Sequence, residues 1–151
     1  MLMPSFFLTL KAALLALTLV LVGQTSAQAQ ATVEPIKTVY HLSDGIPQAA
    51  QAMANIRNHL TADPKAKIVV VAHGHGIDFL LPGATTSAGL PFAGTIADLA
   101  NSGVEFRVCN NTLQARGIDP SKVAMEATLV PSGVAEVARL QAREHFVYLR
   151  P

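Results

Sequence analysis

The feature that most restricts the fold is a continuous apolar run, Ile-Val-Val-Val-Ala, at residues 68–72. A strand without polar residues at alternate positions is typical of a parallel sheet that helices cover on both faces. Further strands are predicted at residues 36–41, 104–109, 127–130 and 145–149. Because crossovers between parallel strands are right-handed, the helices between these strands are expected on both faces. The sequence therefore predicts an α/β fold, a three-layer α/β/α sandwich with a five-stranded parallel sheet.

Helices are expected where apolar residues recur at helical spacing between the strands. The clearest patterns lie at residues 46–60, 92–100 and 134–141, and a short helix should follow the third strand. Residues 77–89 have little pattern. The apolar residues of that stretch, at 79–81, are expected to pack beneath the loop or against another subunit.

The N-terminus has the pattern of an export signal. Residues 12–22 form an apolar run that is too short to cross a bilayer comfortably, and small residues follow, with candidate cleavage sites after Ala27 and Ala29. We expect a signal peptide at residues 1–29, a short linker at 30–35 and one domain at 36–151. The protein is therefore expected to be periplasmic or secreted, without a membrane span after cleavage, and an uncleaved anchor is the minority interpretation.

The charge balance argues against a nucleic-acid partner. The chain has 11 basic and 10 acidic residues, and Lys11 lies in the expected signal. The remaining domain is neutral, has no Lys/Arg cluster and has few aromatic side chains for stacking on bases.

The third strand ends at Cys109, the only cysteine, and the polar residues Asn110, Asn111 and Thr112 follow it. In α/β proteins, reactive groups gather where strands end and helices begin, because unpaired backbone N–H groups favour an anion such as a thiolate. A chemically used thiol at this point is one interpretation. The other is a buried and inert side chain, which is how most free cysteines behave.

Three histidines are expected at the same sheet edge as this cysteine. The first strand ends at His41 and the second at His73 and His75. If these strands are neighbours, the histidines could lower the pKa of the Cys109 thiol, or the set could bind a transition metal. Metal binding is the weaker interpretation, because no other close pair of ligands supports the His-x-His motif. A third interpretation is that Gly74 makes a tight turn and the imidazoles are solvated. No glycine motif for a dinucleotide or a phosphate is complete, so no cofactor is expected.

Four stretches of the sequence carry a family resemblance. They are residues 68–76 (IVVVAHGHG), 103–113 (GVEFRVCNNTL), the 130–134 turn with Leu140-Gln141, and the closing 146–151 segment. On these residues the chain resembles the DsrE/DsrF-like (YchN-like) sulfur-relay family from Val39 to Pro151. Cys-Asn-Asn-Thr-Leu at the end of the third strand is the most specific match.

The resemblance implies a five-stranded parallel sheet and assembly into trimers or hexamers. It also implies that Cys109 accepts sulfane sulfur as a persulfide from a sulfur donor and passes it to an acceptor thiol protein. In this hypothesis, Asn110, Asn111 and Thr112 present backbone N–H groups to the anion, and His41, His73 or His75 tunes its charge. The alternatives are a non-catalytic oligomeric module that binds a small ligand or metal at this edge, and a structural subunit with a buried cysteine.

Overall fold

The computed structural model describes residues 34–151, so the predicted signal peptide and most of the linker lie outside the described residues. Within this range, five strands form one sheet in the order β4-β3-β2-β1-β5, and every neighbouring pair is parallel. The strands are β1 (Lys37–Leu42), β2 (Lys67–Ala72), β3 (Glu105–Cys109), β4 (Ala127–Val130) and β5 (Val147–Leu149). The predicted five-stranded parallel sheet is confirmed.

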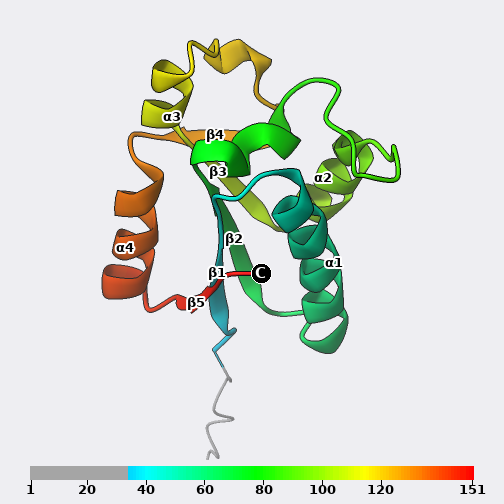
Figure 1. Ribbon diagram of the computed structural model, residues 1–151. Coiled ribbons are helices and arrows are strands. Elements are labelled where there is room, and N and C mark those ends of the chain that lie inside the picture. Colours follow the sequence, from blue (N-terminus) through cyan, green and yellow to red (C-terminus); the bar gives the residue numbers. More distant parts are fainter. Residues whose placement is uncertain (1–33) are drawn as a thin grey trace, which may run out of the picture. The chain divides into compact units, whose positions relative to one another are not determined.

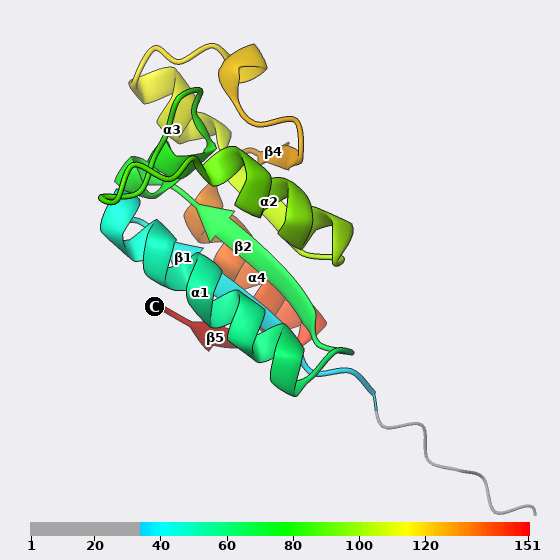
Figure 2. The ribbon, with the colours of Figure 1, turned by 90° about the vertical axis from the view of Figure 1, so that its right-hand side faces the viewer.

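Helices cover both faces of this sheet. They are α1 (Ile46–Ala62), α2 (Phe92–Asn101), α3 (Asn110–Ala115) and α4 (Gly133–Glu144), with the 3-10 helices η1 (Gly74–Leu80) and η2 (Pro120–Lys122). Figure 1 shows α1 and α2 on one side of the sheet and α4 on the other, and Figure 2 shows α4 behind the strands when α1 and α2 face the viewer. The predicted three layers are therefore present. No helix within residues 34–151 has the length and apolar character needed to cross a membrane.

Alternation along the strands gives the sheet two apolar cores. The larger core packs α1, α2 and η1 against residues such as Val70 and Phe106. The smaller core joins Val39 and Val71 of the other face to Leu140 of α4. Successive side chains on a strand point to opposite faces, so residues two positions apart share a face. His41 follows Val39, and His73 follows Val71, by two positions, so both histidines also face α4.

The stretch at 77–89 begins as the second half of η1 and then becomes a loop closed by a bridge between Thr85 and Pro91. Phe79 is 1% exposed and Leu80 is 2% exposed, and both belong to the larger core. For Phe79 and Leu80, packing beneath the loop is therefore the interpretation that the structure shows, whereas Leu81 is half-buried and lines a groove.

A close backbone approach joins η1 to the end of β1. A Cβ atom on Gly76 would lie 2.6 Å from the Ser43 nitrogen and closer still to the Leu42 carbonyl. No side chain fits at that distance, so glycine is required at this position. The contact fixes the loop after β2 against the loop after β1, at the sheet edge where the strands end.

Candidate functional site

Cys109 lies at the junction of one strand and two helices. It is the last residue of β3, it occupies the N-cap position of α3, and it is 4% exposed. The first residue of α4, Gly133, packs against it, with a position for a Cβ atom only 3.2 Å from the Cys109 Cβ. The thiol therefore lies beside the N-termini of both α3 and α4, where helix dipoles favour negative charge.

Hydrogen-bond donors surround the Cys109 sulfur. Burial of the thiol acts to raise its pKa, but the Thr112 hydroxyl and the backbone N–H groups of Gly133, Thr112 and Asn111 act in the opposite direction. The hydrogen bonds outweigh burial, and the pKa of Cys109 is lowered from its ordinary value. A low pKa increases the fraction of nucleophilic thiolate at neutral pH. The geometry thus suits a reactive thiolate better than an inert thiol.

Thr112 is itself held in place from the neighbouring strand. Its Oγ1 accepts a hydrogen bond of 3.0 Å from the backbone N–H of Gly74, which begins η1 after β2. The N–H of Asn111 also donates to the Pro131 carbonyl at 3.2 Å, just before α4. These bonds connect the segments that follow β2, β3 and β4, so the donors around the sulfur are part of a fixed framework.

His73 lies beside Cys109 on the same face of the sheet. Ala72 of β2 pairs in register with Val108 of β3, so His73 and Cys109 occupy the next position on neighbouring strands. A Cβ atom on Gly133 would lie 3.0 Å from the His73 Cβ and 3.2 Å from the Cys109 Cβ. The absence of a side chain at Gly133 allows α4 to start directly above both residues.

His41 extends this group across the sheet. Its Nε2 lies 2.6 Å from the Nε2 of His73, and its Nδ1 lies 2.8 Å from the hydroxyl oxygen of Tyr148 on β5. Burial is the main cause that lowers the pKa of both imidazoles, and the positive charge of Arg150 lowers them further. Both rings are therefore neutral at pH 7. Tyr148, His41, His73 and Cys109 follow one another across β5, β1, β2 and β3.

The other predicted site residues are placed differently. Among the three polar residues after Cys109, Asn111 and Thr112 direct backbone N–H groups at the sulfur, and Asn110 has no such bond among the described residues. His75 has an exposed side chain, whose Nδ1 lies 3.6 Å from a carboxylate oxygen of Asp78. It shares no hydrogen bond with Cys109 in residues 34–151. Hydrogen-bond donors, rather than a histidine cation, account for the lowered pKa of the thiol.

Two members of this site were not predicted. Gly133 contributes because α4 begins above β3, and Tyr148 contributes because β5 lies next to β1. The turn at residues 130–134 does contain a local signal, since Ser132 caps α4 by accepting a bond from the Ala135 N–H at 3.4 Å. That signal identifies a helix start after a strand but not the strand beside which it lies.

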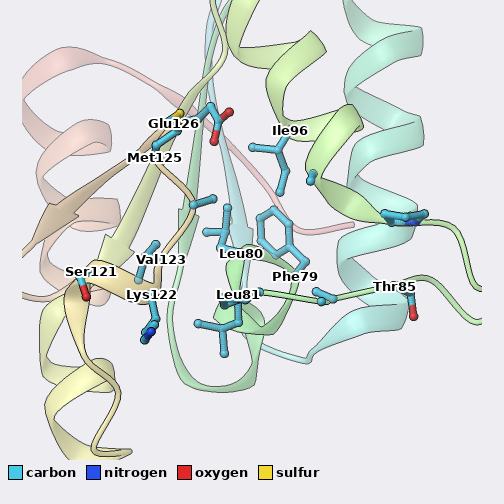
Figure 3. Close-up of a pocket in the computed structure, with 16 residues that line it drawn as sticks. Phe79, Leu80, Leu81, Thr85, Ile96, Ser121, Lys122, Val123, Met125 and Glu126 are labelled. Atoms are coloured by element: carbon cyan, nitrogen blue, oxygen red, sulfur yellow. The ribbon is translucent and has the colours of Figure 1, made fainter.

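A groove lies away from this group. A groove of about 520 Å³ is lined by η1, the loop after it, α2 and residues 121–126. Figure 3 shows Phe79, Leu80, Leu81 and Ile96 in its wall, with Met125 and Val123 across from them. Its lining is mainly apolar and contains no cysteine or histidine. Cys109, rather than this groove, is therefore the candidate site.

In the part of the chain that the structure describes, no group of three or more His, Cys, Asp or Glu side chains is arranged to hold a metal ion. His41 and His73 bring two nitrogens together, but Cys109 does not complete a set of three. The two imidazoles are therefore described as a hydrogen-bonded pair and not as metal ligands.

Comparison with known proteins identifies the family. The sequence model of the DsrE/DsrF-like family matches residues 6–147. The chain belongs to the DsrE/DsrF-like family. This family is linked to sulfur relay, in agreement with the resemblance noted from the sequence.

Two solved structures share the DsrE-like fold. MTH1491 from Methanobacterium thermoautotrophicum, a protein of unknown function, has a TM-score of 0.67 and 29% identity, with 77% of this chain and 99% of that chain covered. The YchN protein from E. coli has a TM-score of 0.61 and 13% identity, with coverage of 78% and 99%. At that identity, YchN supports the fold alone. A comparison with curated proteins found no match.

Proposed function

We propose that this DsrE-like protein carries sulfane sulfur as a persulfide on Cys109. The observation that carries the proposal is the set of donors around the Cys109 sulfur: the Thr112 hydroxyl and the N–H groups of Asn111, Thr112 and Gly133. These groups stabilise the thiolate that must attack a sulfur donor. They also provide fixed dipoles near the negative charge of the resulting persulfide.

The transfer has two steps, and each exchanges one S–S bond for another. The Cys109 thiolate attacks the outer sulfur of a persulfide or polysulfide donor, and the donor leaves as a thiolate. An acceptor thiol protein then attacks the outer sulfur of the Cys109 persulfide and regenerates the thiolate. The low exposure of Cys109 requires both partners to present a narrow, extended sulfur atom at the sheet edge.

Labelled sulfur tests this function in both directions. The protein is incubated with a polysulfide that contains labelled sulfane sulfur, separated from the excess, and mixed with a small thiol. We expect the label to be retained and then released to the thiol, and Cys109→Ser to retain none. Retention by Cys109→Ser equal to that of the wild type would contradict the proposal.

We also propose that the chain is exported, on the basis of the apolar run at residues 12–22 and the small residues after it. Expression of the full chain in a bacterium, followed by fractionation and N-terminal sequencing, tests this. We expect a periplasmic product that begins after Ala27 or Ala29. An intact N-terminus in the cytoplasmic fraction would contradict export.

A homo-oligomer, a trimer or hexamer, is proposed from the family resemblance. The edge strand β5 supports contact between copies, because Val147, Tyr148 and Leu149 are all exposed. Size-exclusion chromatography with light scattering should give a mass of three or six chains. A monomer at micromolar concentration would contradict this part of the proposal.

A further inference from the structure

The contact between His41 and His73 restricts how many protons the two rings hold. Their Nε2 atoms are 2.6 Å apart, which is hydrogen-bond distance. One nitrogen must carry the hydrogen and the other must accept it, because two N–H groups cannot face each other at that distance. The outer nitrogen of His41 contacts the Tyr148 hydroxyl, which can act as donor or acceptor. The proton between the rings can therefore lie on either one.

We infer that His41 and His73 form a shared-proton pair that supplies and removes the proton in sulfur transfer at Cys109. This inference rests on the proposed function and adds the acid–base groups to it. His73 is the member at the end of the strand next to that of Cys109, and His41 acts through His73 as a positioning residue. Tyr148 fixes the His41 ring from β5.

The register of the sheet supports this assignment. His41 pairs with Val71, so His73 lies two residues further along on the same face, within reach of the His41 ring. His73 and Cys109 occupy neighbouring positions directly beyond the last pair of β2 and β3. A Cβ atom on Gly133 would lie within 3.2 Å of the Cβ atoms of both. His73 and the start of α4 therefore both lie beside Cys109 on this face of the sheet.

Burial and the charges that face the pair keep it neutral, so an unprotonated ring nitrogen is present at pH 7. Burial lowers the pKa of both imidazoles most, Arg150 lowers it further, and Asp44, which pairs with Arg150 at 2.6 Å, acts in the opposite direction. Once protonated, such an imidazole is a stronger acid than an isolated histidine. It therefore returns its proton readily to a leaving thiolate.

The reaction then balances without an added oxidant or reductant. The pair takes the proton from the Cys109 thiol, and the thiolate attacks the outer sulfur of a donor R–S–SH. The donor S–S bond breaks and its electron pair stays on R–S⁻, while a new S–S bond forms at Cys109. The pair gives the proton to R–S⁻, so the products are the Cys109 persulfide and R–SH.

Two reactions at the same sulfur separate this role from a structural one. Alkylation by iodoacetamide expels iodide, and iodide needs no proton. Transfer from glutathione persulfide expels a thiolate, and this leaving group takes up a proton. Both rates are measured by intact mass against pH for the wild type, His73→Gln and His41→Gln. Glutamine retains hydrogen bonding but cannot take up the proton. His59→Gln, on α1 and bonded to Tyr40, is the matched control.

We expect His73→Gln to slow sulfur transfer by about 100-fold relative to alkylation, and His41→Gln to do so to a smaller extent. The control should leave the ratio of the two rates unchanged. Equal slowing of both reactions in the histidine variants would overturn the inference while leaving the proposed function intact. If the wild type is alkylated but takes no sulfur, the proposed function itself fails.

Nitrogen-15 NMR of the resting protein tests the pair independently of sulfur and of the stability of any variant. We expect one ring hydrogen on the axis between His41 and His73, and uptake of a single proton by the two rings as pH falls below 6.5, the ordinary pKa of histidine. Independent titration of both rings near that ordinary value would overturn the shared-proton pair.

Discussion

The hydroxyl of Thr112 donates a hydrogen bond to the sulfur of Cys109, one helical turn before it in the chain. The same oxygen accepts the Gly74 N–H at 3.0 Å, so the hydroxyl hydrogen is available for the bond to the thiol. A side chain of α3 thus connects the loop after β2 to the reactive atom at the end of β3. This relation makes the reactivity of the thiol sensitive to a single oxygen atom.

Thr112→Val should raise the pKa of Cys109 and slow its alkylation at pH 7 by about tenfold, because a hydrogen bond to a charged group contributes about 1.5–3 kcal/mol. Thr112→Ser is the matched control, since it retains the hydroxyl. The pH dependence of the alkylation rate measures the effect. A valine variant with the pH profile of the serine variant would show that the hydroxyl does not stabilise the thiolate.

Gly133→Ala should disturb the site without unfolding the domain. The added methyl group would lie 3.0 Å from the His73 Cβ and 3.2 Å from the Cys109 Cβ, so α4 must move away from both. We expect a weaker N–H bond to the sulfur, a raised Cys109 pKa and slower alkylation. Val134→Ala, at the exposed next position of α4, should leave the alkylation rate at its wild-type value.

Gly76→Ala should destabilise the fold strongly. Its methyl group would lie 2.6 Å from the Ser43 nitrogen and closer to the Leu42 carbonyl, and neither backbone atom can move without displacing the end of β1. We expect a loss of about 3 kcal/mol or more in the free energy of unfolding, measured by urea denaturation. Gly94→Ala in α2 meets open space and should be neutral or slightly stabilising. Equal stability of the two variants would contradict the close approach.

Glu136 should give the fold a specific acid sensitivity. Hydrogen bonds from Arg139 and Arg107 lower its pKa from 4.5 to about 2, so its contribution is present above pH 4.5 and is lost as pH falls toward 2. Glu136→Gln should cost about 2 kcal/mol at pH 7 and flatten the stability profile between those two pH values. Urea denaturation at a series of pH values measures both. An unchanged profile in the variant would exclude this ion pair as the cause.

The sheet could be predicted because each strand has a local pattern. The run at Ile68–Val71 is buried on both faces, and its apolar pattern shows this directly. The last strand was predicted from residue 145, but it begins at Val147. His145 instead ends α4 in a left-handed conformation with φ of 60°, and the Phe146 N–H still bonds to the Leu140 carbonyl at 3.1 Å. That ending depends on how α4 packs, which the local sequence does not show.

The candidate site was only partly predictable, because some of its residues are brought together by the assembly of the sheet. Parallel topology brings the ends of β1, β2 and β3 to one edge, so the grouping of His41, His73 and Cys109 follows once these strands are neighbours. The contributions of Gly133 and Tyr148 depend on which strand α4 begins beside and on β5 joining the sheet next to β1. Both are properties of the assembled sheet and have no local sequence signal.

The central claim is that Cys109 carries sulfane sulfur, and intact-mass analysis of the folded protein tests it most directly. The mass is measured before and after treatment with polysulfide, after a reductant, and in parallel for Cys109→Ser. The account predicts a gain of one or more sulfur atoms that the reductant removes and that the serine variant lacks. A wild-type thiol that is free to alkylation but gains no sulfur would contradict it.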